Sequence, residues 1–554
     1  MSHSNLYIPT ATMKTVNKYI LSLAVGAFAA VGMSSCSDFL QEYSQDLAKV
    51  ESWQDLDEVL LGSGYMQPSA MSAQGRNGDD IDCLHFMADE MKQTYVSEYD
   101  THSYLSSMYA YYTWQAEMGY NPLKKYVGGD DKYWNKLYSS INVCNMVIYL
   151  IDEQPENDPD DVIQKRRVKG EAYFLRSAYY FLLANMYAKP YDPSTAASTP
   201  GVPVKTTEFV EDQEYVRENL ADTYTRILDD LSQAESLLKD TPVKTLHRAT
   251  YSAVLLFRSR VYLYMQDWKN AARYASLTLD QNRRLLDLHT KAVGDDCVYL
   301  SSPETLFSMG GYRIADAFSD NVDDFGSQTS PHFCVSDVME QKYSADDLRS
   351  GLYIGKSEIL GVSPVFLKRN GQFSKRSTVS DVSSTFLLRT PEAYLTLAEA
   401  SAFDNNENLA RTTLEAFMLT RYRSAVTVSQ SGNDLIDLIR EERAREFILE
   451  GHRWFDLRRY TVCQPYPWST VIEHAHGYFA ATGPWGLKEF SYAEVFRLEE
   501  FDEGYTLPIP RPIREFQPSI GNNNRPRREV VRVDRPEPDT EGGDQGGSGW
   551  EWEW

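Results

Sequence analysis

The feature that most constrains this sequence is the helical spacing of its apolar residues. One continuous stripe recurs every three or four positions: Ala172, Leu175, Ala178, Tyr179, Leu182, Leu183 and Met186. Such a stripe is typical of a helix that buries one face against its neighbours. Similar stripes occur in residues 220–238, 251–265, 391–403 and 435–449. The chain is therefore expected to be mainly helical.

Two of these stripes begin helix pairs that look alike. A helix from Ala253 to Tyr264 is followed by a turn at residues 266–268, and a helix from Ala393 to Ala402 is followed by a turn at residues 405–406. Small residues at helix crossings, with aromatic side chains filling the gaps, resemble tetratricopeptide hairpins, which stack into a superhelix. We predict an all-α fold, mainly a tetratricopeptide-like superhelix of helix pairs, with long loop-rich insertions and minor β structure.

Two stretches between the helix pairs have a different composition. Residues 310–332 are rich in Gly, Asp, Ser and aromatic residues, and residues 351–384 contain short alternating runs that suit small strands. We interpret both as functional loops laid over the helical scaffold.

The beginning of the chain has the order of a secretory signal. Two lysines after Met13 precede a short apolar run, too short for the roughly 20 residues that a membrane-spanning helix needs. The run leads to Met33-Ser34-Ser35-Cys36, which resembles a lipobox, with Cys36 as the lipid-anchored residue; an ordinary cleavage site is the alternative. Residues 1–35 are thus predicted to be a lipoprotein signal peptide, with either Met1 or Met13 as the true start.

Charge and cysteine content exclude several classes of function. Removal of residues 1–35 takes away two lysines and no acid, which changes the formal charge from −24 to −26. So acidic a surface repels nucleic acid and anionic headgroups. Five cysteines remain, without CxxC pairs or zinc-like spacing, and we interpret them mostly as small buried hydrophobes.

No Pro/Gly/Ser-rich linker divides residues 36 to about 520, which favours one large body. The composition changes only after that body. Five arginines fall between Arg525 and Arg535, and residues 536–554 carry six acids, a Gly/Ser-rich stretch and three tryptophans. We expect residues 525–554 to be a disordered charged tail.

Taken in order, several segments resemble the SusD/RagB family of outer-membrane nutrient-binding lipoproteins of Bacteroidetes. They are the lipobox with Ser37-Asp38-Phe39-Leu40, the segment Trp134, Tyr138, Ile141 and Asn145, the run Gly170 to Ser177 leading to Tyr187, the hairpin Ala253 to Ala275, the helix Arg389 to Ala400, the run Ile439 to Arg459, and Leu507-Pro508-Ile509-Pro510. The sequence departs from the family at its end, where Gly521 replaces the usual Gln before Asn522 and a charged tail follows.

The resemblance implies a body over residues 36–524, with an N-terminal part to about residue 240 and a C-terminal part from about 241. It also implies a binding lid, seated on a SusC-like TonB-dependent transporter, that captures a glycan or peptide ligand. The lipid would hold the protein at the outer membrane, surface-exposed.

The charged residues of the chain are more typical of a structural role than of a catalytic one. The run from Glu441 to Arg458 mixes carboxylates and arginines, but Glu441 and Arg445 are four residues apart and suit a pair on one helix face. His474 and His476 could share one side of a strand, yet no third metal ligand is near them in the sequence. No GxSxG, P-loop, GxGxxG or HExxH motif occurs, and we predict no cofactor, no metal and no catalytic residue.

Sugar binding needs exposed aromatic faces with amide, acidic or guanidinium groups beside them. The richest such stretch contains Tyr111, Tyr112, Trp114 and Gln115, and it precedes the Trp134 segment, where the resemblance places ligand-contacting aromatics. Aromatic residues at helical spacing are more often core than platform. Further candidates for ligand contact are Tyr312 and Phe325 in the later loop, and Arg76 and Asn77 in a Gly-flanked loop.

The predicted function is therefore that of a non-catalytic lipoprotein that captures oligosaccharides. A peptide-binding member of the same family is the alternative. A secreted glycoside hydrolase is less favoured, although the pairs Asp79-Asp80 and Asp323-Asp324 could supply two carboxylates. A repeat scaffold for protein partners is a third hypothesis.

Overall fold

The computed structural model describes residues 50–67, 81–95, 103–209, 213–311, 321–322, 328–329, 332–356, 364–368, 382–481 and 488–536. Helices dominate: α2 (Trp53–Val59), α3 (Cys83–Met87), α4 (Ser103–Tyr112), α5 (Lys132–Leu150), α6 (Pro159–Tyr187), α7 (Leu220–Leu238), α8 (Tyr251–Tyr264), α9 (Trp268–Gln281), α11 (Asp337–Glu340), α12 (Arg349–Leu352), α14 (Thr390–Phe403), α15 (Glu407–Met418), α16 (Gly432–Glu446), α17 (Arg453–Tyr460) and α18 (Arg511–Phe516). The prediction of a mainly helical chain is confirmed.

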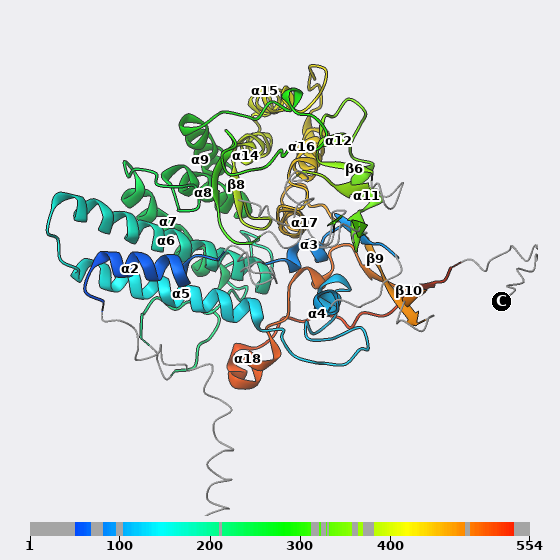
Figure 1. Ribbon diagram of the computed structural model, residues 1–554, viewed down its shortest axis with the longest axis horizontal. Coiled ribbons are helices and arrows are strands. Elements are labelled where there is room, and N and C mark those ends of the chain that lie inside the picture. Colours follow the sequence, from blue (N-terminus) through cyan, green and yellow to red (C-terminus); the bar gives the residue numbers. More distant parts are fainter. Residues whose placement is uncertain are drawn as a thin grey trace, which may run out of the picture.

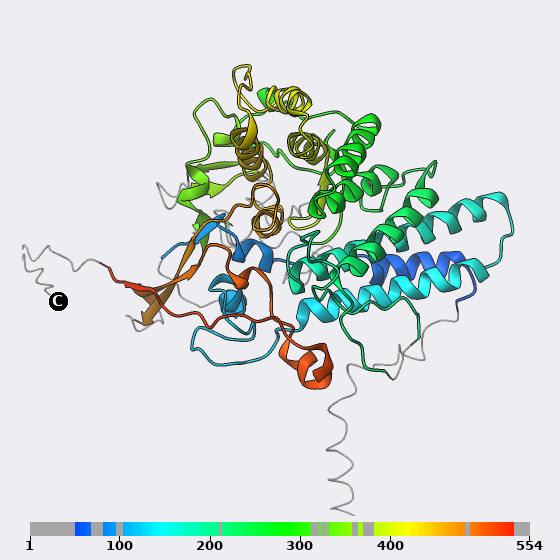
Figure 2. The same cartoon turned by 180° about the vertical axis from the view of Figure 1, so that it is seen from behind.

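The long helices α5, α6 and α7 lie side by side at one end of the molecule, and the pairs from α8 to α16 continue the stack from them (Figures 1 and 2). Asp158 caps the start of α6, where its side chain accepts hydrogen bonds from the backbone of Asp160 and Asp161. The predicted apolar stripe of α6 is buried along its whole length. At Gly170 a Cβ would lie 2.8 Å from Leu238 of α7, so the close crossing of α6 and α7 requires glycine there.

Two helix pairs have the same turn, which explains why they look alike in sequence. Between α8 and α9 the turn has Gln266 at φ 60°, and between α14 and α15 it has Asn405 at φ 61°. The next residue caps the second helix in each pair: Asp267 accepts from the backbone of Asn270, and Asn406 accepts from that of Leu409. Helices α9 and α14 also pack on each other, so the two hairpins form consecutive layers, as predicted.

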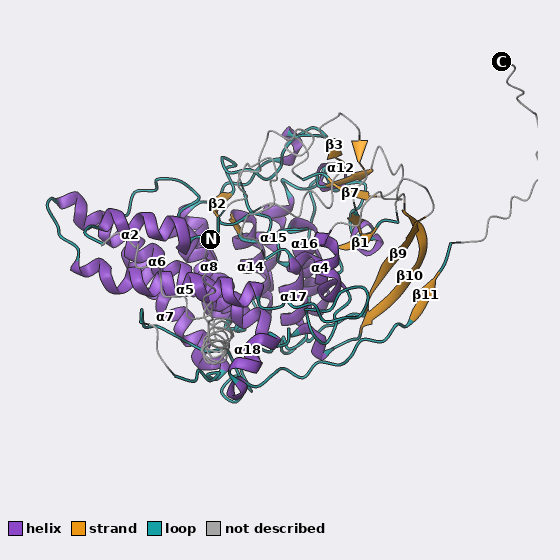
Figure 3. Ribbon diagram, turned by 60° about the horizontal axis from the view of Figure 1, so that its bottom comes forward, coloured by secondary structure: helices purple, strands orange, loops and turns teal. Residues whose placement is uncertain are grey.

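The strands are short except for one hairpin. They are β1 (Met91–Gln93), β2 (Thr305–Ser308), β3 (Asn321–Val322), β4 (Gln328–Thr329), β5 (Phe333–Val335), β6 (Ile354–Lys356), β7 (Pro364–Phe366), β8 (Leu387–Arg389), β9 (Ile472–Ala481), β10 (Lys488–Leu498) and β11 (Arg532–Asp534). The predicted small strands in residues 351–384 are present as β6 and β7, which pair antiparallel. The sheet β11-β10-β9 lies at the end of the molecule opposite α2 (Figure 3).

The charged run of α16 forms part of a buried ion network. Five cations face five carboxylates there: Arg349, Lys368, Arg389, Arg421 and Arg445 with Glu304, Asp347, Glu442, Glu446 and Glu450. Arginine partners hold the pKa of Glu446 well below its usual range, although burial alone would raise it. Glu441 and Arg445 also pair at 3.5 Å. The structural reading of this run is confirmed.

The expectation of a disordered tail from residue 525 is wrong for its first part. Arg528 pairs with Asp502, and Arg525 donates a 2.9 Å hydrogen bond to the Thr506 carbonyl. Residues 532–534 then add β11 to the edge of β10. Ion pairing and strand pairing thus order the arginine-rich segment, whereas residues 537–554 lie outside the described chain.

The five cysteines of the described chain are buried, as predicted: Cys83, Cys144, Cys297, Cys334 and Cys463.

Candidate functional site

The outer face of the β9–β10–β11 sheet is the candidate site. In the register of the sheet, Phe479 lies opposite Phe490, and Gly477 lies opposite Ala493. Asp534 of β11 also lies opposite Ala493, so these side chains share one face. The other face turns toward the helical body at His474 and Phe496, which lie opposite each other and are buried.

Tyr95 lies on this outer face, just beyond β1. Its ring stacks on Phe490 with 4.2 Å between centroids and an interplanar angle of 17°, and Phe490 contacts Phe479 at 6.1 Å. The ring fits because Gly477 lies beneath it, where a Cβ would come within 2.8 Å of Tyr95. Tyr95 is 38% exposed, and both phenylalanines are half-buried. We call Tyr95, Phe479 and Phe490 the outer aromatic cluster.

Charged pairs border the outer aromatic cluster. Arg532 contacts Asp534 at 2.6 Å and Glu473 at 3.3 Å, and Arg497 contacts Glu473 at 2.5 Å. Hydrogen bonds from Arg497 hold the pKa of Glu473 below its usual range. Burial, with a smaller effect of Asp534, raises the pKa of Tyr95 to about 12, so its hydroxyl keeps its proton. A ring face beside guanidinium and carboxylate groups is the chemistry that binds sugar rings and their hydroxyls.

The predicted platform of Tyr111, Tyr112 and Trp114 is not exposed, and this prediction is wrong. All three side chains are buried, Trp114 completely. They pack behind the sheet: the His474 ring lies between Tyr112 and Trp114, at 4.2 and 4.3 Å. Strand β9, which follows much later in the sequence, covers the rings of Tyr112 and Trp114. Helical spacing alone does not show whether such rings are buried or exposed.

These buried rings nevertheless support the outer face. The Tyr112 hydroxyl accepts a hydrogen bond from the Gln93 backbone at 3.1 Å and donates to the Ala475 carbonyl at 3.4 Å. It therefore joins β1, which leads to Tyr95, to β9, which carries Phe479. The Trp114 indole donates to the Met87 carbonyl at 3.0 Å. Gln115 is half-buried and donates to Thr113 next to it.

The other predicted contact residues, Arg76, Asn77, Tyr312 and Phe325, lie outside the described residues, as does Cys36. The described end of the predicted loop 310–332 does lie at the outer face. The Thr94 backbone donates a 2.9 Å hydrogen bond to His332, and β1 pairs with β5. The predicted loop 310–332 therefore ends next to Tyr95.

The two histidines of β9 do not form a metal site with other groups of the described chain. The ring nitrogens of His474 face the carbonyl oxygens of Tyr112 and Ala88 at 2.7 and 3.0 Å. Burial lowers the pKa of His476 to about 4, and its ring packs edge-on against Tyr109 and Tyr478. Within the described ranges, no three His, Cys, Asp or Glu side chains gather as metal ligands do.

The outer aromatic cluster was missed by reasoning from the sequence. Alternation is visible in the sequence as His474, His476 and Tyr478, followed by Phe490, Tyr492 and Phe496, and it predicts two strands with these rings on one face. The β-bulge between Phe490 and Tyr492, which turns Phe490 to the face of Phe479, has no such signal. The candidate acid pairs Asp79-Asp80 and Asp323-Asp324 lie outside the described residues. None of the helices placed by the structure has the length and apolar character needed to cross a membrane.

Comparison with known proteins gives two family matches. Residues 80–263 match a SusD-like family described as starch-binding, associating with the outer membrane, and residues 365–524 match the SusD family. A SusD-like protein of Bacteroides ovatus is 23% identical over 374 residues, which cover 58% of this chain. The match spans 64% of the length of that relative.

Solved structures share the fold over most of the chain. A SusD-like carbohydrate binding protein from Bacteroides vulgatus is 18% identical with a TM-score of 0.62, and the match covers 85% of this chain and 98% of that one. A SusD superfamily protein from Bacteroides thetaiotaomicron is 20% identical with a TM-score of 0.61, over 86% of this chain and all of that one. Surface glycan-binding protein A from Bacteroides uniformis is 15% identical with a TM-score of 0.61, over 85% and 99%. With its helix pairs and both family matches in chain order, this protein belongs to the SusD/RagB family.

Proposed function

We propose that the protein is a non-catalytic cell-surface lipoprotein that captures oligosaccharides and delivers them to a TonB-dependent outer-membrane transporter. Two structural relatives support the ligand class, since they are a carbohydrate binding protein and a surface glycan-binding protein. The lipobox at Cys36 supports attachment to the membrane.

The outer aromatic cluster is the observation that carries this proposal. The C–H face of a pyranose packs on an aromatic ring, and Tyr95 has the most exposed ring of the cluster. Arg532 and Asp534, beside Tyr95, can donate to and accept from sugar hydroxyls. Both lie on β11 and therefore keep a fixed position relative to the ring.

The charges on this face favour binding over hydrolysis. A glycosidase needs one carboxyl group that holds a proton near neutral pH, which requires a raised pKa. Here Arg497 and Arg532 pair with Glu473 and lower its pKa. Asp534 is likewise paired with Arg532. Glu473 is therefore suited to accept hydrogen bonds and unsuited to donate a proton.

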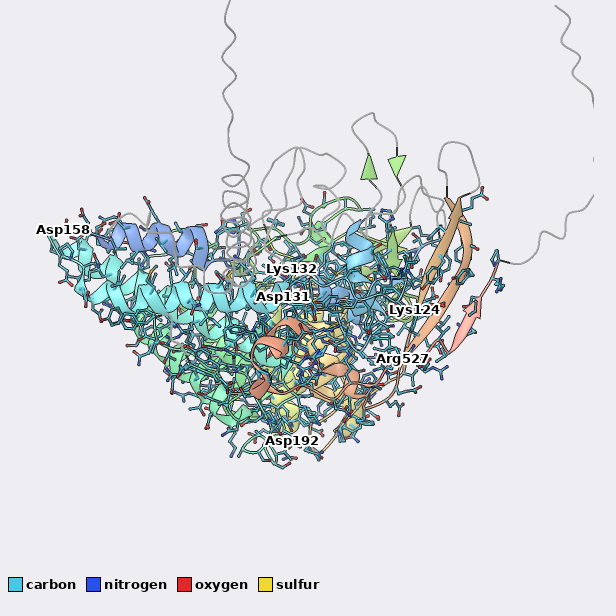
Figure 4. All side chains as sticks on the ribbon, turned by 90° about the horizontal axis from the view of Figure 1, so that it is seen from below. Lys124, Asp131, Lys132, Asp158, Asp192 and Arg527 are labelled. Atoms are coloured by element: carbon cyan, nitrogen blue, oxygen red, sulfur yellow. The ribbon has the colours of Figure 1, made fainter. Side chains whose placement is uncertain are left out.

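Titration calorimetry on the chain starting at Ser37, with panels of oligosaccharides and peptides, tests the proposal. We expect saturable binding of an oligosaccharide, weakened more than about fivefold by Tyr95→Ala, because an anchoring ring contributes at least about 1 kcal/mol. The matched control is Tyr149→Ala. Tyr149 is 48% exposed on the last turn of α5. That turn lies near Asp158, at the far end of the molecule from the sheet (Figure 4).

Other outcomes separate the alternatives. Saturation by peptides alone would favour a peptide-binding member of the family. Heat that continues to flow after each injection would show turnover and contradict a non-catalytic role. Equal losses in the Tyr95 and Tyr149 variants would remove the outer aromatic cluster from the binding site.

A further inference from the structure

The sequence beyond β11 carries a motif that the proposed function does not use. After Pro536 the chain has a Gly/Ser-rich spacer at residues 542–549 and then Trp550-Glu551-Trp552-Glu553-Trp554. In an extended chain, alternate side chains point to opposite sides, so this pattern suits three indoles on one side and two carboxylates on the other. The motif is that of a short aromatic ligand on a tether.

The described structure fixes where this tether begins. Strand β11 runs antiparallel to β10, with Arg532 opposite Val495 and Asp534 opposite Ala493. Each step along β11 therefore brings the chain closer to the Phe490 end of β10. The chain leaves the described structure at Pro536, two residues after Asp534, on the edge of the sheet that bears the outer aromatic cluster (Figure 3).

The exit point is held in place by the preceding residues. Arg528 donates to Asp502 at 2.7 Å and to the Trp114 carbonyl at 3.2 Å. The Val531 backbone donates to Val495 at 2.9 Å, which sets the register of β11. The start of the tether thus keeps a constant position relative to Tyr95 and Phe490.

The chain after Pro536 is long enough for its tryptophans to reach the outer aromatic cluster. A Gly-rich chain of about 14 residues, the spacing from Pro536 to Trp550, has a root-mean-square span of roughly 20 Å. A linker of about this length gives a tethered group an effective concentration on the order of millimolar. Even a weak affinity for the outer aromatic cluster would then give substantial occupancy.

We propose that Trp550, Trp552 and Trp554 bind back onto the outer aromatic cluster of the same chain and compete there with the oligosaccharide. Indoles pair with exposed aromatic rings in stacked or edge-to-face contacts. Arg497 and Arg532, whose side chains are 39% and 53% exposed, border the cluster, but Glu473 and Asp534 already pair with them. Contact between the indoles and the exposed rings therefore carries the docking.

Competition gives the tail a definite effect on affinity. The apparent Kd of a ligand equals its intrinsic Kd divided by the fraction of molecules whose site is uncovered. A tail that covers the cluster in about four fifths of the molecules would raise the apparent Kd about fivefold. This step rests on the proposed function, whereas the docking of the tail does not.

The docking is tested with a synthetic peptide of residues 546–554, titrated into the chain that carries Trp550→Ala, Trp552→Ala and Trp554→Ala together. We expect saturable binding with a Kd of about a millimolar or tighter. Tyr95→Ala should abolish it, Tyr149→Ala should leave it unchanged, and a peptide with its three tryptophans replaced by alanine should not bind. Absence of saturation at several millimolar peptide would overturn the inference.

The competition is tested by titrating the same oligosaccharide into the native chain and into the triple-tryptophan variant. The variant should bind severalfold more tightly, and equal affinities would overturn the competition. The two proposals fail separately. Peptide binding without any oligosaccharide binding would contradict the proposed function alone, and oligosaccharide binding without peptide binding would contradict the inference alone.

Discussion

At the scale of single residues, Trp114 does not contact ligand as the sequence suggests. Its ring packs behind the sheet that carries the outer aromatic cluster. Its indole is fully buried, stacks on His474 and donates to the Met87 carbonyl. Trp114→Ala should lower the free energy of unfolding by about 3–5 kcal/mol, as expected for a large ring lost from a core. Denaturant unfolding measures this value, and Tyr95→Ala, which removes one exposed stacked ring, should cost only about 1 kcal/mol. Equal, small effects of the two substitutions would contradict the burial of Trp114.

Glu90 gives a prediction for the pH dependence of stability. Burial raises its pKa from 4.5 to about 8, and its carboxyl accepts a 2.9 Å hydrogen bond from the Leu449 backbone. Between these pH values the folded protein holds a proton that the unfolded chain has released, so this group makes stability fall as pH rises. Its contribution is at most about 1.4 kcal/mol per pH unit.

Glu90→Gln should remove this contribution. The difference between the two free energies of unfolding, variant minus native protein, should increase from pH 5 to pH 8 and stay constant above that range. Urea unfolding at several pH values measures the difference. A difference that does not change with pH would show that Glu90 is ionised in the folded protein.

At the scale of helices and strands, the buried ion network ties α16 to the loops around it. Arg421 donates to Glu446 at 3.0 Å and to Glu304 at 2.6 Å. Arg421→Met should destabilise the protein by about 3–5 kcal/mol, because it takes one buried cation from two carboxylates that stay buried. The control, Arg411→Met, breaks a half-buried surface pair with Glu407 and should cost less than about 1 kcal/mol. Comparable midpoints of unfolding for the two variants would contradict a central role for the network.

The helix pairs could be predicted from the sequence because their determinants are local. The stripe of α6 and the turns at Gln266 and Asn405 each depend on residues within a few positions of one another. The outer face could not be predicted in the same way. Tyr95 acquires its role from Gly477 and Phe490, which are far away in the sequence. The packing of β9 against α4 also buries Trp114. The local spacing of aromatic residues therefore predicted an exposed ring where the ring is buried.

At the scale of the whole molecule, we expect a body anchored by its lipid, with the binding face at the end that carries the β9–β10–β11 sheet. Cys36→Ser should remove the site of lipid attachment and move the protein from the membrane fraction to the soluble fraction of cells. Several acyl chains anchor far more firmly than one, since each buried CH₂ contributes about 0.8 kcal/mol. Fractionation with immunoblotting measures the change. Unaltered membrane retention of the variant would contradict anchoring through Cys36.

Hydrogen–deuterium exchange with and without a bound oligosaccharide shows whether the outer aromatic cluster is the binding site, because it locates the ligand on the whole chain at once. We expect slower exchange in residues 91–95 and 488–495, around the outer aromatic cluster, and unchanged exchange in the last turn of α5, near Asp158 at the far end of the molecule (Figure 4). Slower exchange confined to segments away from the β9–β10–β11 sheet would contradict it.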